Sequence, residues 1–472
     1  MQPLPLSSLV DAVSGEAIRV RRLDDLVQRV VIDSRLVRSG DLFVPLAGER
    51  QDGHQFIADA IQRGAVAALA ARQWVAAQKN STGLIAVDDP LAALWQLAAW
   101  NRDQADALRI AVTGSVGKTT TRHMLHTVLS RRFAGIESPE NYNNHIGVPL
   151  SLLQLDSTHE FAVLETAASR LGEIDRLARL IAPEIGLLTA IAPAHLEHFR
   201  SLEAICRAKG ELLESLPASG IAVLNGDDPL VRRLARRAPC RVILAGEEIQ
   251  NDVVATRVKV NDRRLRFRVG ATEFQLPAVG RHHLNSALLS IAVAREIGLT
   301  DSEISAGLKD FVPMHGRCEK TSIGPWTVID DSYNASPASM VAACETLRDW
   351  QDARRRVLVV GDMLELGEHS SEFHAQLGEL VADCQFNLLI AVGPQAGSVT
   401  ANARSHGMDP GCLGACSDFD TAYILLDCWL EPGDVILVKG SRGMHMEQVV
   451  EHLRKRAEVE HSQATSPLHK AA

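Results

Sequence analysis

The segment RIAVTGSVGKTTTRHMLHTVL, residues 109–129, determines the fold that this sequence predicts. An apolar run stands directly before a loop rich in glycine and threonine, and a helical pattern follows the loop directly. A strand, a phosphate-binding loop and a helix in this order are typical of a nucleotide-binding domain with a parallel sheet. The loop consists of Gly114, Ser115, Val116, Gly117, Lys118, Thr119 and Thr120.

The residue types of this loop suit the phosphates of ATP. Glycines let backbone N–H groups surround phosphate oxygens, and the N-terminus of the next helix adds a positive partial charge. Lys118 supplies a full positive charge, and Thr119 offers a hydroxyl ligand for Mg²⁺. The complete G-x-x-x-x-G-K-[ST] pattern would start with glycine at position 112, where this sequence has Val112. An ordinary glycine-rich turn is the alternative, but Lys118 and two threonines follow Gly117 in register, so we predict ATP and Mg²⁺ as ligands.

From residue 108 onward, buried strand patterns alternate with amphipathic helix patterns, which favours a parallel α/β architecture. The first block of strands and helices comprises 109–114, 120–129, 161–165, 185–191, 202–216 and 221–225. The second block comprises strand patterns at 326–331, 355–362, 388–393 and 434–440. We expect this second block to form a smaller α/β sheet of its own.

The predicted fold class is α/β with three domains. At roughly 150 residues per domain, the 472 residues suggest about three domains. The first hundred residues differ in texture, because short apolar runs alternate there with turn residues. We place an N-terminal domain at 1–104, a central domain with a mostly parallel sheet at 105–314, a C-terminal domain at 315–460 and a flexible tail at 461–472.

Composition and charge exclude several classes of function. The 49 basic and 58 acidic residues give a net charge of -9, so no overall positive field is available to bind a nucleic acid. The first residues lack a basic leader, and no uncharged apolar run approaches the roughly 18 residues of a membrane span. The eight cysteines include no Cys-x-x-Cys pair, which fits reduced thiols. We therefore expect a cytoplasmic protein with no nucleic-acid partner and no membrane insertion.

Two polar residues at predicted strand ends are candidate metal ligands. Glu165 ends the run FAVLE, and His195 follows the run IGLLTAI. The carboxyl ends of parallel strands open into the crevice that binds ligands in such sheets. A solvated glutamate is the alternative for Glu165. His195 and His198 flank Glu197 as His-x-x-His, but no third ligand stands at a recognisable zinc spacing, so we do not predict zinc there.

Eight ordered motifs resemble those of the Mur ligase family. They are GSVGKTTT (114–121), NYNNHIGVPLSLL (141–153), AHLEHFRSLEAICRAKGELL (194–213), GRHHLNSALLSIAVA (280–294), GRCEK (316–320), DDSYNASPASM (330–340), GDMLELGEH (361–369) and VKGSRGMHMEQVV (438–450). The likeness covers about residues 30 to 453. SYNASPASM and GDMLELG are similar to the branch that adds a dipeptide, and the DNPR-type signature of the branch that adds the third amino acid is absent.

The resemblance implies an ATP-dependent peptide ligase. Such an enzyme joins D-alanyl-D-alanine to UDP-N-acetylmuramoyl-tripeptide through an acyl phosphate, in peptidoglycan precursor synthesis. The N-terminal domain would bind the UDP-sugar, the central P-loop domain ATP, and the Rossmann-like C-terminal domain the amino substrate. A monomer is expected. The alternatives are a paralogous ligase for another amine and carboxylate, and, from another class, a P-loop switch or kinase.

The resemblance also implies roles for individual residues. For catalysis, it implies Lys118, Glu165, His195, Lys209 and Arg317. For ATP, it adds Asn285 at the adenine, Arg317 at the phosphates and Asp331 at the ribose to the loop residues 114–120. For Mg²⁺, it implies Thr119, Glu165, His195 and Lys209, the last as a carbamate, because an ammonium cannot ligate a metal. For the two substrates, it implies Ser34, Arg35, Asn141, Asn143, Asn144, His145, Tyr333, Asn334, Lys439, Ser441 and Arg442.

For several of these residues the sequence also allows an ordinary structural role. Arg35 could form a surface salt bridge, Lys209 could lie on a helix surface, and the asparagines of 141–144 could form a turn. At four positions the sequence departs from the family pattern: Thr166, Ala167, His198 and Arg200. We expect that larger side chains there could crowd the peptide substrate without affecting ATP chemistry.

Overall fold

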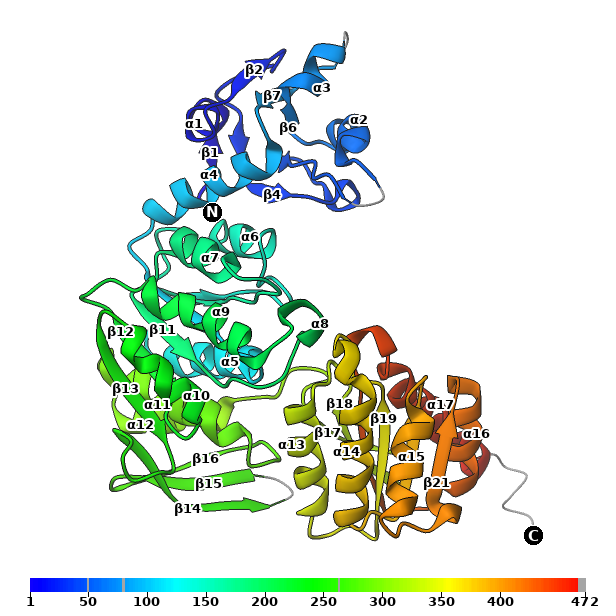
Figure 1. Ribbon diagram of the computed structural model, residues 1–472. Helices are drawn as coiled ribbons and strands as arrows, with labels where there is room; N and C mark the ends of the chain where they lie inside the picture. Colours follow the sequence, from blue (N-terminus) through cyan, green and yellow to red (C-terminus); the bar gives the residue numbers. More distant parts are fainter. Residues whose placement is uncertain (49–50, 79–80, 262–263, 466–472) are drawn as a thin grey trace.

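The computed structural model describes residues 1–48, 51–78, 81–261 and 264–465. It shows three α/β domains that follow one another along the molecule in sequence order (Figure 1). The described residues form sheets of five, nine and six strands, with a separate two-stranded pair, β1 and β3, near the N-terminus. The α/β class and the three-domain organisation are therefore confirmed. The predicted boundaries at 104/105 and 314/315 fall between elements, after α4 and after α12.

The first domain contains a five-stranded sheet in the order β2-β7-β6-β5-β4, in which only the β2–β7 pair is antiparallel. Its elements are β1 (Leu4–Pro5), α1 (Leu6–Ala12), β2 (Glu16–Ile18), β3 (Leu26–Val27), β4 (Arg29–Val31), η1 (Ser34–Leu36), β5 (Asp41–Phe43), η2 (Gly53–Phe56), α2 (Ile57–Gln62), β6 (Ala67–Ala71), α3 (Arg72–Ala77), β7 (Leu84–Val87) and α4 (Pro90–Asp103). Part of the loop GERQDGH, namely residues 49–50, lies outside the described residues.

The central domain contains the nine-stranded sheet, in the order β16-β15-β14-β13-β12-β11-β8-β10-β9. Its elements are β8 (Leu108–Thr113), α5 (Lys118–Leu129), β9 (Gly135–Glu137), α6 (Gly147–Leu152), β10 (Phe161–Glu165), α7 (Glu173–Ile181), β11 (Ile185–Leu188), α8 (Leu196–Phe199), α9 (Leu202–Glu214), β12 (Ile221–Asn225), α10 (Pro229–Leu234), η3 (Ala235–Arg237), β13 (Arg241–Gly246), β14 (Val253–Asn261), β15 (Arg264–Val269), β16 (Thr272–Leu276), α11 (His283–Glu296) and α12 (Asp301–Asp310). In this order, all neighbouring strands between β14 and β9 are parallel, including β8. Strands β15 and β16 extend the sheet beyond β14, and each is antiparallel to its neighbour.

The C-terminal domain contains the six-stranded sheet, in the order β17-β18-β22-β19-β20-β21, parallel except for the β17–β18 pair. Its elements are β17 (Glu319–Ile323), β18 (Trp326–Asp331), α13 (Pro337–Arg348), β19 (Arg355–Gly361), η4 (Gly367–His369), α14 (Ser370–Asp383), β20 (Leu388–Val392), α15 (Ala396–Ser405), η5 (Pro410–Cys412), β21 (Leu413–Cys416), α16 (Phe419–Trp429), β22 (Asp434–Lys439), η6 (Arg442–Met444) and α17 (Glu447–Thr465). Helix α17 thus continues into the predicted tail, of which 466–472 lie outside the described residues.

The position of β8 in the middle of the sheet explains why residues 110–112 are all apolar. Ile110 and Val112 face a core that includes Met124 of α5, whereas Ala111 belongs to the core on the opposite face with Ile174 of α7. A strand covered by helices on both faces needs apolar residues at successive positions. β8 pairs in parallel with β10 and β11, so the carboxyl ends of three strands meet at one edge.

Helix α4 attaches the first domain to the central domain. The side-chain amide of Asn101, which is 5% exposed, donates hydrogen bonds to the carbonyls of Leu152 and Leu155, each at 3.0 Å. One turn and a half earlier, the Trp95 indole N–H donates to the carbonyl of His145 at 2.8 Å. These contacts fix the position of the loop around residue 145 relative to the first domain.

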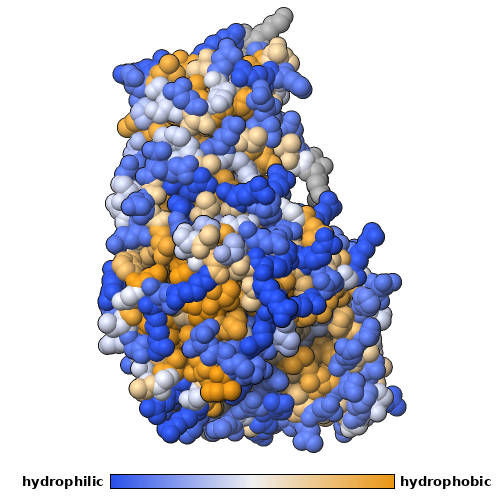
Figure 2. All heavy atoms as spheres, turned by 60° about the vertical axis from the view of Figure 1, so that its left-hand side comes forward, coloured by the Kyte–Doolittle hydropathy of each residue, from blue (hydrophilic) through white to orange (hydrophobic). Residues whose placement is uncertain are grey.

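The surface carries apolar residues in several places. Figure 2 shows a mixture of hydrophilic and hydrophobic residues, with the larger hydrophobic area lying below the first domain. Within the part of the chain that the structure covers, none of the helices has both the length and the apolar character that crossing a bilayer requires.

We expect Asn101→Ala to destabilise the junction between α4 and the central domain by about 1–3 kcal/mol, because two buried hydrogen bonds, to the carbonyls of Leu152 and Leu155, are lost. Urea denaturation followed by tryptophan fluorescence measures this effect as a lower midpoint. Gln104→Ala is the matched control, since the Gln104 amide at the end of the same helix makes an exposed contact of 3.4 Å. Equal midpoints for the two variants would contradict the role assigned to Asn101.

Candidate active site

The phosphate loop follows β8 and curves into the N-terminus of α5. Gly114 has φ +151° and Gly117 has φ +82°, and a Cβ atom on Gly114 would lie 2.0 Å from Thr189 Oγ1. Thr189 follows β11, and its hydroxyl donates to the carbonyl of Val116 at 2.6 Å. The loop therefore lies against the next strand of the sheet, and position 114 accepts only glycine. Val112, where the longer pattern has glycine, remains inside β8 and is fully buried.

Lys118 is the first residue of α5, and its ammonium donates to the carbonyl of Ser115 at 3.2 Å. Burial lowers the pKa of Lys118, the Glu165 carboxylate opposes this shift, and Arg317 adds to it. The ammonium therefore lies near one carboxylate and a second cation. A helix N-terminus and a half-buried lysine together form a binding site for an anion such as a phosphate group.

Glu165 ends β10 and is 2% exposed. Its Oε1 accepts a hydrogen bond from the Asn143 amide at 2.8 Å, and its Oε2 lies 3.6 Å from Arg122 Nη1. Burial alone would raise the pKa of Glu165, but Lys118 and Arg122 hold it below its ordinary value. The carboxylate is therefore ionised at neutral pH.

The oxygen atoms around Glu165 fit a hard divalent cation. Glu165 Oε2 is buried and has no hydrogen-bond partner among the residues that the structure describes. Thr119 is 4% exposed and lines the same cleft as Glu165. A free carboxylate oxygen and a hydroxyl beside a phosphate loop are the donor types that Mg²⁺ takes in nucleotide sites. The chain thus has a donor set suited to Mg²⁺ at the place that the sequence predicted.

His195 directly precedes α8, and Lys209 is a residue of α9. His195 has φ +54°, and its Nδ1 contacts a carboxylate oxygen of Glu365 in the loop after β19. Burial lowers the pKa of His195, although Glu365 opposes that shift. Lys209 is 2% exposed on α9, and burial together with the Lys118 ammonium lowers its pKa to about 7. Lys209 is consequently not a helix-surface lysine, and much of it is an uncharged amine at neutral pH.

The C-terminal domain contributes the opposite wall. The guanidinium of Arg317 lies 3.9 Å from the centre of the Tyr333 ring, and its Nε is buried without a hydrogen-bond partner in the described part of the chain. Lys439, at the end of β22, donates to Asp331 at 2.5 Å and to the carbonyl of Asn334 at 3.0 Å. The strand ends of β18 and β22 therefore present a cation, an aromatic ring and a polar network to the cleft.

The two walls enclose a cleft of about 730 Å³. Asn285 of α11 lies at its margin, with its amide donating to the carbonyl of Thr189 at 2.9 Å and its Oδ1 buried without a partner among the described residues. Predicted site residues from both domains line the cleft: Ser115, Val116, Gly117, Lys118, Thr119, Thr120, Asn143, Asn144, His145, Glu165, His195, Asn285, Arg317, Asp331, Tyr333, Asn334, Lys439, Ser441 and Arg442.

Five predicted site residues do not line the cleft. Gly114, the first residue of the phosphate loop, lies against Thr189, and Lys209 lies close enough to Lys118 and Glu165 for their charges to affect its pKa. Asn141 lies earlier in the loop than Asn143. In the first domain, Ser34 is buried in η1, and Arg35 is exposed and pairs with Asp33 at 2.7 Å.

Three of the four departures from the family pattern do not line the cleft. Thr166 is buried at the end of β10, where its N–H donates to the carbonyl of Val112 at 2.9 Å, and His198 and Arg200 are exposed. Only Ala167 lines the cleft. The effect of these side chains on the peptide substrate stays a prediction.

Sequence reasoning missed two charged residues of this site. Arg122 is 1% exposed and contacts Glu137 at 2.9 Å as well as Glu165. Its position four residues after Lys118 puts both side chains on one face of α5, and this spacing was the available signal. Glu365 has φ +62° in the loop GDMLELG, and no local pattern indicates its contact with His195.

Comparison with known proteins gives matches over all three domains. The family descriptions that match are Mur ligase family, catalytic domain (residues 26–99), Mur ligase middle domain (112–294) and Mur ligase, glutamate ligase domain (316–442). A protein of Bacillus subtilis strain 168 named UDP-N-acetylmuramoyl-tripeptide--D-alanyl-D-alanine ligase is 33% identical over 455 residues, covering 95% of this chain and 98% of its own.

Two solved structures have a similar fold along nearly the whole chain. A crystal structure of MurF from Acinetobacter baumannii superposes with a TM-score of 0.87 at 30% identity and covers 96% of this chain and 99% of its own. A crystal structure of MurF ligase from Thermotoga maritima in complex with ADP has a TM-score of 0.80 at 30% identity and covers 92% of this chain and 99% of its own.

Gly114→Ala should abolish high-affinity nucleotide binding, because the new Cβ would collide with Thr189 and displace the loop. Calorimetric titration with ADP measures the affinity, which we expect to fall by at least about tenfold. Gly172→Ala serves as the control: Gly172 also has a positive φ, of +82°, but nothing lies within 4 Å of its added Cβ. An unchanged ADP affinity in Gly114→Ala would disprove the assignment of the loop.

Proposed function

The chain belongs to the Mur ligase family, and we propose that it joins D-alanyl-D-alanine to UDP-N-acetylmuramoyl-tripeptide at the cost of one ATP. The products are UDP-N-acetylmuramoyl-pentapeptide, ADP and phosphate, and the step belongs to peptidoglycan precursor synthesis. The relatives that carry this name match the chain from end to end rather than in one domain, which supports transfer of the whole reaction.

The observation that carries the proposal is a single cleft that holds the phosphate loop of one domain and the cationic wall of another. Lys118 and Glu165 come from the central domain, and Arg317 and Lys439 come from the C-terminal domain. ATP and an amino substrate brought by different domains would therefore meet in one space. Holding reactants in this way can supply about 7–11 kcal/mol of the barrier.

The reaction needs activation because a carboxylate is a poor acyl donor. The terminal carboxylate of the tripeptide attacks the γ-phosphorus of ATP, forming a carboxyl–phosphate bond and releasing ADP. The free amine of D-alanyl-D-alanine then attacks the acyl carbon, and the amide forms as phosphate leaves with the former carboxyl oxygen. Lys118 and Arg317 are suited to neutralising the charge on the transferred phosphoryl group.

Binding of the nucleotide is assigned along the cleft. Residues 114–120 surround the phosphates through N–H groups, Lys118 and the helix N-terminus. Asn285 has an unpaired Oδ1 beside Thr189, which suits the exocyclic amine of an adenine. Asp331 is assigned to the ribose. In the structure its carboxylate accepts from Lys439 and from the Cys318 N–H, so it is already held in one orientation.

Mg²⁺ completes the nucleotide site. The cation, when bound, neutralises charge on the β- and γ-phosphates. Thr119 and Glu165 would hold it through oxygen, with His195 as a ligand to a second ion. Carbamylated Lys209 is the further ligand that we propose, because its pKa of about 7 leaves an uncharged amine that CO₂ can modify.

The UDP-sugar is assigned to the first domain, the peptide to the cleft beside Asn143, and the dipeptide to the C-terminal wall of the cleft. Ser34 and Arg35 would bind the diphosphate of the UDP-sugar, and the loop of Asn143, Asn144 and His145 would contact the peptide near its reacting carboxylate. The dipeptide side is formed by Tyr333, Asn334, Lys439, Ser441 and Arg442. A cytoplasmic location fits this assignment, because ATP is cytoplasmic and the cysteines are unpaired thiols. We also propose that the protein is a monomer.

The acyl-phosphate route predicts transfer of one oxygen from the donor carboxylate to phosphate. UDP-N-acetylmuramoyl-tripeptide labelled with heavy oxygen in its terminal carboxylate is incubated with ATP and D-alanyl-D-alanine. Mass spectrometry should find the label in the released phosphate and the pentapeptide among the products. Lys118→Ala should form neither while keeping the circular dichroism spectrum of the parent chain, and phosphate free of label would refute the route.

Lys209 should form a carbamate as the pH rises through about 7, because only the uncharged amine reacts with CO₂ and a lowered pKa makes that form abundant above this value. The amine gains CO₂ and releases one proton. Labelled bicarbonate and carbon NMR detect the adduct. The resonance should be absent in Lys209→Arg and retained in Lys309→Arg, which alters an exposed lysine of α12. A resonance that persists in Lys209→Arg would contradict the proposal.

A further inference from the structure

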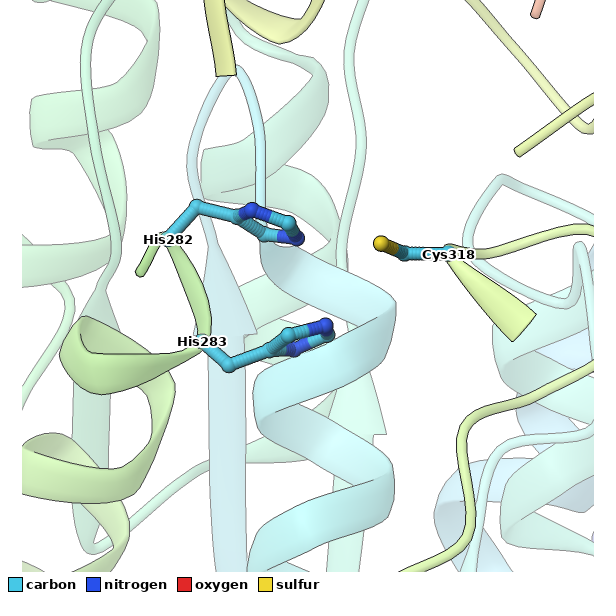
Figure 3. Close-up of side chains that lie close together, drawn as sticks. All are labelled: His282, His283 and Cys318. Atoms are coloured by element: carbon cyan, nitrogen blue, oxygen red, sulfur yellow. The ribbon is translucent and has the colours of Figure 1, made fainter. Parts of the chain in front are cut away.

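Two histidines and one cysteine meet where the central and C-terminal domains face each other. His282 and His283 lie at the start of α11, and Cys318 lies just before β17, beyond the predicted domain boundary. Figure 3 shows both imidazole rings directed toward the Cys318 sulfur. One potential ligand atom from each residue lies within 4.8 Å of the other two.

The His283 side chain forms no hydrogen bond with any residue that the structure describes. It is 2% exposed, and neither of its ring nitrogens has a hydrogen-bond partner among the described residues. A buried polar group without a partner costs about 1–3 kcal/mol, so its presence calls for a ligand. The His283 ring lies 4.2 Å from the His282 ring, and burial lowers the pKa of His283 well below its ordinary value. Its imidazole is therefore neutral at neutral pH, which is the form that binds a metal.

Cys318 supplies a soft ligand in the same space. It is 3% exposed, and its sulfur lies 3.6 Å from the carbonyl of Val279. The backbone N–H of Cys318 donates to Asp331 at 3.0 Å, so the cluster lies next to a carboxylate that is itself paired with Lys439. Burial raises the pKa of the thiol well above its ordinary value, and metal binding would release its proton to solvent.

We propose that His282, His283 and Cys318 form a Zn²⁺ site that joins the central domain to the C-terminal domain, with a fourth position open to water. In a tetrahedral zinc site the metal lies about 2.0–2.1 Å from nitrogen and about 2.3 Å from sulfur. Two ligand atoms are then about 3.3–3.6 Å apart, so the present spacing, which is within 4.8 Å, has to shorten by at most about 1.5 Å. Mg²⁺ is unsuited to this set, because it prefers oxygen ligands.

A second cluster, of His315, Glu319 and Asp330, is less suited to a metal. His315 contacts Glu319 at 2.9 Å, and Asp330 Oδ1 accepts from the Ser332 hydroxyl at 2.6 Å, although Asp330 Oδ2 is buried without a partner among the described residues. The histidines and cysteine of the first cluster have weaker contacts or none. The soft sulfur and two nitrogens also select zinc over the calcium and magnesium that oxygen clusters take.

Zinc at this position would oppose nucleotide binding. Cys318 and the two histidines line the same cleft as Asn285 and Asp331, to which we assign the adenine and the ribose. A metal that links α11 to the segment before β17 would also hold the two domains at one separation. Because coupling between two ligands is reciprocal, ATP should weaken Zn²⁺ binding by the factor by which Zn²⁺ weakens ATP binding. This inhibitory consequence rests on the proposed function, whereas the metal site itself does not.

The test uses the full chain, freed of metal and without nucleotide or substrate, titrated with Co²⁺ as a spectroscopic substitute for Zn²⁺. We expect a thiolate-to-cobalt absorption band with the visible bands of four-coordinate cobalt, both removed by one equivalent of Zn²⁺. Cys318→Ser should lose the thiolate band, and His283→Ala should bind Zn²⁺ at least about tenfold more weakly. Cys344→Ser is the matched control, since Cys344 is another fully buried thiol of the C-terminal domain.

The outcomes separate the two proposals. No thiolate band in the parent chain, or a band that survives in Cys318→Ser and disappears in Cys344→Ser, overturns the zinc site whether or not the chain is a ligase. If Cys318→Ser does not fold, His282→Ala replaces it, because His282 is the exposed member of the cluster and its loss should also weaken binding. Zn²⁺ inhibition of phosphate release is then measured for each variant relative to its own rate without Zn²⁺, and we expect the parent chain to be the most sensitive.

Discussion

The structure depends on the charge balance around one buried carboxylate. Glu165 ends a central strand where water is excluded, and an isolated charge there would be strongly unfavourable. Lys118 and Arg122 from α5 and Arg317 from the C-terminal domain compensate it. Without the carboxylate these three cations would repel one another. The attraction of the cations to Glu165 therefore keeps the phosphate loop, the end of β10 and the C-terminal domain close together before any ligand binds.

Much of the fold could be predicted from the sequence because its signals are local. The run at 109–114, the loop at 114–120 and the helix that follows are contiguous, and the structure has β8 and α5 at these places. The alternation of strands and helices predicted the parallel sheets for the same reason. The end of α17 was predicted less well, because helix patterns in a polar segment are weak.

The site was less predictable because its contacts join distant residues. Nothing local in the sequence indicates that Glu365 contacts His195, 170 residues away, or that Cys318 faces His283. Burial of Lys209 was also hidden, since a lone lysine in a helix pattern is usually exposed. The family resemblance brought Lys209 and Arg317 into consideration, and the structure supplied the physical reasons for their unusual environments. No sequence pattern showed that Thr166, His198 and Arg200 do not line the cleft.

The attachment of helix α4 has a consequence for the length of the donor that can react. Trp95 and Asn101 fasten the first domain to the loop that bears His145 and to the end of α6, so the span from η1 to the phosphate loop is set by the protein chain itself. A donor anchored by its nucleotide near Ser34 would present its far end at a fixed reach. A peptide one residue too short would stop before the γ-phosphate, and one residue too long would overshoot it, so discrimination by reach requires no side chain that recognises the missing or extra residue.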